Sequence, residues 1–234
     1  MASSSITASA MYSSAIGTPP AGSAMPRTSG FLFPLPLTPA LWLSDNGVDP
    51  AQWTDMSGNG RHAIQNTGAN QPAIVTNVLN GRQVRRFDGT NDGMTGTMTL
   101  SQPFTIITVA KHDVTGSTQS VFHGANCSLG IQGGVGFFLY AGAVISSAGS
   151  NTNFNINTHI FNGTSSAIFS DEVSLVSGNA NTAGVANFSI GFRSGSNDEF
   201  VDGDIAEIIV FSAALTTAQR EQVEAYLNNK YSIY

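Results

Sequence analysis

From Leu41 to the C-terminus the chain is a series of short β-type runs separated by turn signals, and this pattern restricts the fold more than any other feature. In FTIITVAKH (104–112) apolar side chains occupy both alternating sets of positions, which is typical of a strand covered on both faces. The further runs are VGFFLYAGAVISS (135–147), HIFNGTSSAIFSDEVSLV (159–176), ANFSIGFR (186–193) and DIAEIIVFS (204–212). No rhythm of long helices separates them, so we predict an all-β fold of two packed antiparallel sheets.

One helix is predicted, and it begins after Leu215. Thr216 and Gln219 have the spacing of a capping box, in which each side chain bonds the backbone of the other. An apolar stripe that can dock on the sheet is formed by Val223, Tyr226 and Leu227. Arg220 and Glu224 are spaced to pair on another face of the helix. The predicted architecture is therefore a β-sandwich closed by a short C-terminal helix.

Charge is scarce, because Asp, Glu, Lys and Arg make up 10% of the 234 residues and the net charge is −6, against about 25% charged residues in an average domain. The densest basic cluster is Arg82, Arg85 and Arg86, with no aromatic residue between them. Phosphate binding needs a concentrated Lys/Arg surface, so no nucleic-acid partner is expected.

Cys127 is the single cysteine, which excludes an internal disulfide and a Cys-based zinc site, and we interpret it as a small buried side chain. No run approaches 18 apolar residues, so no membrane span is expected. The N-terminus has no basic region followed by an apolar one, so no Sec signal peptide is expected either.

Residues 1–38 differ from the rest, being rich in Ser, Ala, Thr and Pro with one charge, Arg27. We treat them as an extended N-terminal arm and residues 39–234 as the folded domain. Such composition is typical of a disordered tail, so if the arm is ordered we expect contacts with another chain to hold it. The segment FLFPLPL (31–37) is either an anchoring strip or the lead-in to the first strand.

Four segments together resemble the laminin-G-like branch of the concanavalin A-like lectin/glucanase superfamily, of the kind found in phage virion and surface proteins. They are LWLSDNGVDPAQWTDMSGNGRHAIQ (41–65), NGRQVRRFDGTNDGM (80–94), FTIITVAK (104–111) and GDIAEIIVFSAALTTAQREQVEAYLNNKY (203–231). The resemblance covers about residues 41–234, departs most at 113–185, and implies an antiparallel jelly roll with Trp42 and Trp53 in the core. It implies no single activity, because the family includes sugar binders, glucanases, adhesion modules and structural domains.

Asp202, Asp204 and Glu207 form a carboxylate cluster that resembles a glucanase array, since hydrolysis needs two carboxylates on either side of the bond. Asp stands where the family's nucleophile is Glu, and the cluster lies in the last strand rather than mid-chain. Without a bulge, Asp204 and Glu207 also point to opposite faces of the sheet. We interpret the cluster as scaffold, and we predict no catalytic residue and no enzymatic activity.

Calcium is the one cofactor left open, with Asp88, Asn91 and Asp92 of FDGTND as candidate ligands. A second acidic stretch holds Asp198 with the carboxylates of the last strand. The alternative is that Asp and Asn serve turns in both places, with glycine supplying the positive φ.

Sugar binding would require exposed aromatic rings together with Asn or Asp. The divergent middle of the chain offers Phe137, Phe138, Tyr140 and Phe154, for which burial in the core is the alternative. The four histidines have no metal-ligand spacing.

Two functions follow. The first is a non-enzymatic structural protein of a virus particle, either a phage head decoration (cement) protein or a tail-associated protein, whose arm binds other virion proteins within an oligomer or larger assembly. The second is a carbohydrate-binding or adhesion module at a cell surface, with calcium dependence left open. The expected location is the virion in the first case and the extracellular surface in the second.

Overall fold

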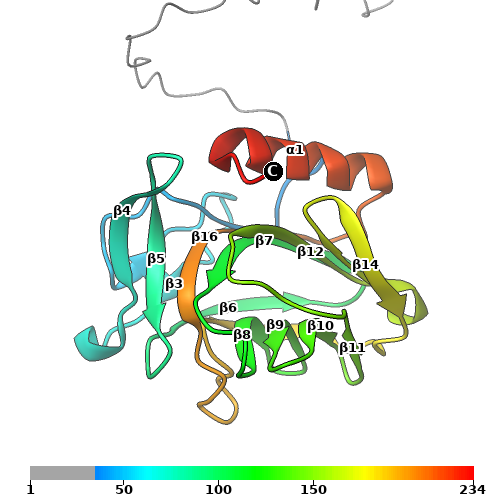
Figure 1. Cartoon of the computed structure of the whole chain (residues 1–234), viewed down its shortest axis with the longest axis horizontal. Coiled ribbons are helices and arrows are strands. Elements are labelled where there is room, and N and C mark those ends of the chain that lie inside the picture. The colour runs from blue at the N-terminus through cyan, green and yellow to red at the C-terminus, as the bar shows by residue number, and fades with distance from the viewer. Residues whose placement is uncertain (1–34) are drawn as a thin grey trace, which may run out of the picture. The chain divides into compact units, whose positions relative to one another are not determined.

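The strand-like runs pair into two eight-stranded antiparallel sheets in the computed structural model, which describes residues 35–234 (Figure 1). Sheet A consists of β1 (Leu41–Leu43), β4 (Ala73–Leu79), β5 (Arg82–Asp88), β7 (Phe104–His112), β12 (Asn155–Phe161), β13 (Ser166–Ser170), β14 (Val173–Gly178) and β16 (Asp202–Phe211). Sheet B consists of β2 (Gln52–Trp53), β3 (Ala63–Ile64), β6 (Met94–Leu100), β8 (Gln119–Gly124), β9 (Cys127–Gln132), β10 (Gly136–Tyr140), β11 (Val144–Ser146) and β15 (Val185–Ile190). Two 3₁₀ turns, η2 (Gly68–Asn70) and η3 (Gly163–Ser165), and the helix α1 (Thr217–Tyr231) complete the described chain. The predicted all-β sandwich with one C-terminal helix is confirmed.

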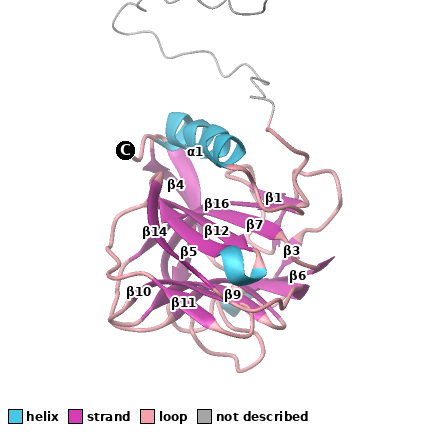
Figure 2. Cartoon of the chain, turned by 90° about the vertical axis from the view of Figure 1, so that its right-hand side faces the viewer, coloured by secondary structure: helices cyan, strands magenta, loops and turns pink. Residues whose placement is uncertain are grey.

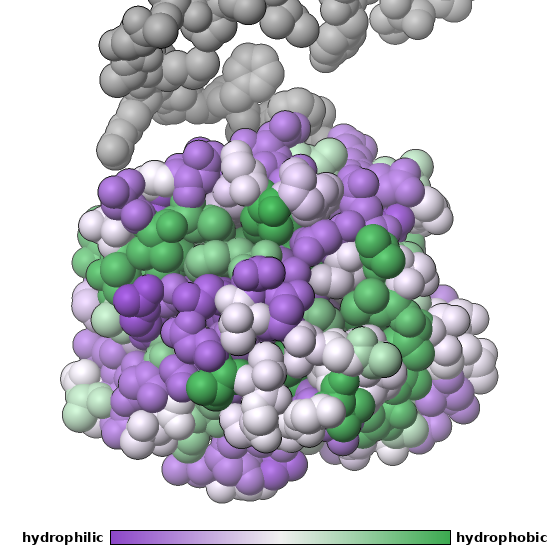
Figure 3. All heavy atoms as spheres, viewed as in Figure 1, coloured by the Kyte–Doolittle hydropathy of each residue, from purple (hydrophilic) through white to green (hydrophobic). Residues whose placement is uncertain are grey.

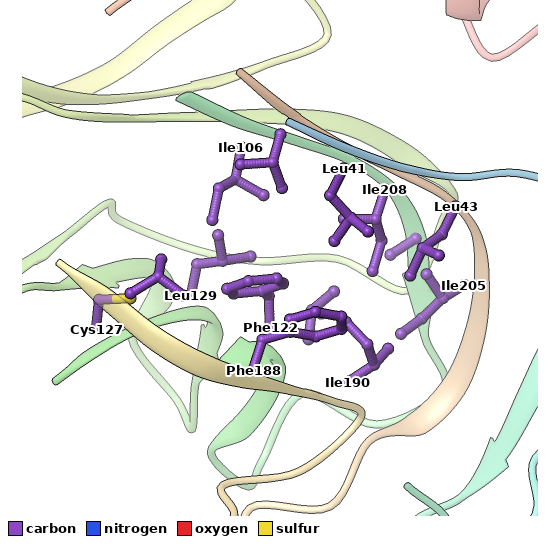
Figure 4. Close-up of a cluster of buried hydrophobic side chains, with 14 of the residues drawn as sticks. Leu41, Leu43, Ile106, Phe122, Cys127, Leu129, Phe188, Ile190, Ile205 and Ile208 are labelled. Atoms are coloured by element: carbon purple, nitrogen blue, oxygen red, sulfur yellow. The ribbon is translucent and has the colours of Figure 1, made fainter. Parts of the chain in front are cut away.

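The main core lies between the two sheets, and it depends on the alternation of side chains along each strand. In Figure 4, Leu41, Ile106 and Ile208 of sheet A face aromatic and aliphatic side chains of sheet B. The rings of Phe122 and Phe188 stack there, with centroids 5.6 Å apart. The strand predicted at 104–112 is β7 over its full length, and it lies between β12 and β16 in the middle of sheet A.

A second apolar cluster covers the other face of sheet A, where α1 packs (Figure 2). Thr216 caps the helix, and the predicted capping box with Gln219 is present. Val223 and Leu227 are fully buried in this cluster. Sheet A is therefore covered on both faces, by α1 on one side and by sheet B on the other.

The predicted pair of Arg220 and Glu224 forms, but both side chains are buried rather than on an open face of the helix. The Arg220 guanidinium lies 4.3 Å from the ring centroid of Phe169, and Thr158 Oγ1 donates to Glu224 Oε1 at 2.6 Å. A contact that looked like a local helix pair therefore joins α1 to sheet A.

Only residues 35–38 of the predicted arm are described, so the arm and its boundary at residue 38 stay predictions. Leu35 packs against the cluster beneath α1, as a lead-in to β1 would. Within residues 35–234 no helix is long and apolar enough to cross a membrane.

His159 is an ionisable side chain inside the sandwich. It lies on β12, where the preceding residue, Thr158, points toward α1 and bonds to it. Side chains alternate along a strand, so His159 points to the opposite side, into the sandwich, as Phe161 does. It is 1% exposed, and neither ring nitrogen makes a hydrogen bond of normal geometry within residues 35–234. Burial lowers the pKa of His159 to about 3, and the neighbouring backbone of Phe138 opposes only part of this shift.

We expect His159 to make the fold sensitive to mild acid. Its pKa is lower in the folded chain than in the unfolded chain, so the unfolded state binds the proton first and stability falls as pH drops below about 6.5. From pH 7 to pH 5 this single group removes about 2 kcal/mol of unfolding free energy. Urea unfolding at the two pH values measures the loss, and His159→Leu should flatten it. An equally steep loss in His159→Leu would show that the effect comes from other groups.

Candidate functional site

The outer face of sheet B is the sheet surface that neither α1 nor the other sheet covers, and strand alternation decides what it carries. On β10, Phe137 and Leu139 point into the main core, so Phe138 and Tyr140 point outward. On β6, Met94 and Met98 are buried in the core, and the threonines between them are exposed. The side chains on the outer face of sheet B are therefore aromatic at β10 and carry hydroxyl groups at β6.

A hollow of about 410 Å³ lies over β8 to β11, and we call it the aromatic basin. Its main lining residues are Phe138, Tyr140, Ser128, Gln132, Arg193 and Glu199. The Tyr140 side chain is partly exposed, whereas Phe138 is nearly buried. An apolar floor with a few polar groups at its rim is the usual composition of a small-molecule site.

A wider hollow of about 660 Å³ lies over β3, β6 and β15, and we call it the threonine basin. Its main lining residues are Thr95, Thr97, His62, Asn187, Ser194 and Gly195. His123 of β8 lines both basins, so they adjoin at this residue, and we refer to the two basins together as the groove.

The loop between β15 and β16 forms one wall of the groove, and ion pairs hold it in shape. Arg193 Nε and Nη2 bond the two carboxylate oxygens of Asp198 at 2.8 and 2.6 Å. Arg193 Nη1 lies 3.1 Å from Glu199 Oε1, while Ser120 Oγ donates to Glu199 Oε2 at 2.6 Å. The wall is thereby fastened to β8, the strand at the centre of the groove.

His123 stands among these charged groups. Burial lowers its pKa, and Arg193 lowers it further, while Glu199 and Asp198 act in the opposite direction. Ser194 Oγ lies 3.4 Å from His123 Nδ1. At neutral pH the junction of the basins is therefore an uncharged imidazole.

Of the four aromatic residues predicted for sugar binding, two face the groove and two do not. Phe138 and Tyr140 face the groove, Phe137 belongs to the core, and Phe154 lies by Lys111 in the cluster beneath α1. Sequence reasoning missed the polar wall at Arg193 and Glu199, because it joins the groove only through the fold. Strict alternation along VGFFLY was the signal that could have separated Phe138 from Phe137.

The carboxylates of β16 lie away from the groove, on the side of sheet A that faces α1, and they bind other side chains of the chain. A bulge between Ile205 and Glu207 turns both Asp204 and Glu207 to the helix side, so the opposite orientations expected of a regular strand do not occur. Arg86 binds Asp204 through two nitrogens at 2.7 and 2.9 Å. Asp202 pairs in register with Asp88 at the strand end.

Glu207 is fully buried and accepts hydrogen bonds from four side chains in two segments of the chain. Trp42 Nε1, Tyr231 OH and Lys230 Nζ each lie 2.6 Å from its carboxylate oxygens, and Ser44 Oγ lies at 3.3 Å. Trp42 is only half-buried, whereas Trp53 is fully buried as the resemblance implied. The contacts are those of a scaffold group.

The candidate calcium ligands form a reciprocal turn. Asp88 Oδ1 accepts from the backbone N–H groups of Thr90, Asn91 and Asp92, and Asp92 Oδ2 accepts from the N–H of Asp88 at 3.1 Å. Burial and the charge of Asp88 raise the pKa of Asp92 to about 6. In residues 35–234 no group of three or more His, Cys, Asp or Glu side chains is arranged to hold a metal ion. Turn formation accounts for the motif, and calcium there stays a prediction.

No protein-family model matches the chain, and no curated protein matches it in sequence. Solved structures do match. Trypanosoma rangeli sialidase in complex with sialic acid superposes with a TM-score of 0.62 at 14% identity over 84% of this chain and 34% of the sialidase. The chain thus spans about a third of the sialidase it matches.

Two further structures are similar. Domain 4 of AbnA, a GH43 extracellular arabinanase from Geobacillus stearothermophilus in complex with arabinotriose, has a TM-score of 0.58 at 17% identity, over 78% of this chain and 96% of that domain. Botulinum neurotoxin type C, described as interacting with two ganglioside molecules, has a TM-score of 0.61 at 10% identity, over 81% of this chain and 51% of the toxin chain. The chain has a β-sandwich fold of two antiparallel sheets, like these structures. At these identities the likeness concerns the fold alone.

Replacing Glu207 by Gln should weaken the fold. The change breaks the buried ion pair with Lys230 and places an amide N–H₂ among the donors of Trp42 and Tyr231, which costs about 3 kcal/mol. The melting temperature measures this, with Glu221→Gln as the matched control because Glu221 is exposed and its loss should be nearly neutral. An unchanged melting temperature together with loss of a glycosidase activity would instead show that Glu207 is catalytic.

Proposed function

We propose that this chain is a carbohydrate-binding domain that holds a glycan in the groove on the outer face of sheet B. The observation that carries the proposal is the outward pair Phe138 and Tyr140 beside a polar, loop-built wall. A sugar ring presents C–H groups on its faces and hydroxyls around its edge. An aromatic floor with hydroxyl, amide and carboxylate groups at the rim is complementary to both.

The structural neighbours support this proposal. The arabinanase domain matches over nearly its whole length and was solved with arabinotriose, and the toxin is described as interacting with gangliosides. On the face shown in Figure 3, apolar residues gather in patches among polar ones.

We propose binding without hydrolysis. Asp204 and Glu207 are fully buried on the helix side of sheet A, where Arg86 and the Glu207 hydrogen bonds occupy them. In the groove, Glu199 is held by Arg193 and Ser120. These contacts assign the carboxylates to the scaffold and the groove wall.

Tyr140→Ala should weaken glycan binding about tenfold or more, because it removes the exposed ring of the aromatic basin; tenfold corresponds to about 1.4 kcal/mol. A glycan array followed by titration calorimetry with the best-bound glycan measures the change. Tyr234→Ala is the matched control, since Tyr234 is an exposed tyrosine at the C-terminus beyond α1. Equal affinity of wild type and Tyr140→Ala would place the glycan elsewhere.

We further propose, as a separate hypothesis, that the chain is a structural protein of a virus particle whose arm binds neighbouring virion proteins and places the lectin-like domain at the particle surface. Its support is the composition of residues 1–38, together with the packing of Leu35 at the foot of the arm against the cluster beneath α1. Deletion of residues 1–34 should then abolish incorporation into particles while leaving glycan binding intact. Normal incorporation of the truncated chain would contradict the virion role.

A further inference from the structure

The groove has a charge pattern that selects among glycans, and the following inference rests on the proposed function. We propose that the groove binds a neutral oligosaccharide, several sugar units long, and discriminates against sugars that carry a carboxylate. Both parts follow from contacts in the groove and not from the structural neighbours.

The length follows from the sheet. The two basins meet at His123 and together extend from β6 to β11, which are separated by β15, β8, β9 and β10. Five inter-strand spacings of about 4.8 Å give a groove of about 24 Å. One sugar ring fills a small part of that length, so the complementary ligand is a chain that crosses the strands.

The discrimination follows from Arg193, the single Lys or Arg among the described residues that line the two basins. A carboxylate ligand is normally held by a free guanidinium fork. Here all three guanidinium nitrogens of Arg193 are already paired, two with Asp198 and one with Glu199. The trio of Arg193, Asp198 and Glu199 carries a net charge of −1, so an incoming carboxylate meets repulsion instead of a partner.

The remaining groove lining carries no carboxylate, Lys or Arg. His123 at the junction is neutral at pH 7. The threonine basin offers Thr95, Thr97 and Asn187, and the aromatic basin offers Gln132. Hydroxyl and amide groups both donate and accept, as sugar hydroxyls do, and they give a carboxylate no compensating charge.

The test uses pairs of glycans that differ in charge alone. An array of neutral oligosaccharides printed beside their sialylated or uronic-acid counterparts selects a pair, and titration calorimetry on the full chain then measures both members at low and high salt. We expect the neutral member to bind at least about tenfold more tightly, with little salt dependence, and its affinity to rise with chain length until both basins are filled.

Charge-removing variants provide the positive control. Asp198→Asn, alone or with Glu199→Gln, frees the Arg193 fork and should raise the affinity for the acidic member relative to the affinity for the neutral member. Asp198 is 45% exposed, so the single variant should keep the wild-type melting temperature. Equal or tighter, salt-sensitive binding of the acidic member by the wild type would overturn the charge selection and leave the proposed function standing. No binding of any glycan would overturn both.

Discussion

The Glu207 carboxylate is the contact on which the arrangement of layers depends. It joins Trp42 of β1, β16 itself, and Lys230 and Tyr231 at the end of α1. Lys230 is held in turn by Asp45 at 2.7 Å. A buried charge pair of this kind is a weak source of net stability, but its donors come from both β1 and α1, so it ties the end of the helix to this face of sheet A. The helix therefore covers sheet A and leaves the outer face of sheet B open.

Much of the fold could be predicted because its signals are local. The two-sided apolar run of β7, the capping box at Thr216 and the turn residues depend on neighbours a few positions away. The Trp-x-Asp-x-Ser motif is of the same kind, since Asp55 accepts hydrogen bonds from the backbone of Trp42, Ser57 and Arg61 and shapes its own loop. Local chemistry of this sort explains why the four motifs indicate a β-sandwich from the sequence alone.

What could not be predicted depends on long-range geometry. A one-residue bulge in β16 reverses the side to which Glu207 points, and no residue type in DGDIAE predicts this bulge. The groove likewise combines β6, β8, β10 and the loop at Arg193, which are far apart in the chain. Sequence could nominate Tyr140 as a sugar-facing ring, but only the fold places it beside the wall at Glu199.

The wall of the groove shows how the fold prepares a binding surface. Asn197 and Glu199 both have positive φ, which costs free energy for residues other than glycine and persists only where surrounding contacts enforce it. The contacts are present: Ser120 binds Glu199 through both its backbone N–H and its side chain. Because these contacts already order the loop, a ligand does not have to supply that ordering free energy. The contacts that hold this strained loop therefore favour a groove of fixed shape. In a fixed groove Arg193 stays paired, and this pairing is what allows charge to discriminate between otherwise similar glycans.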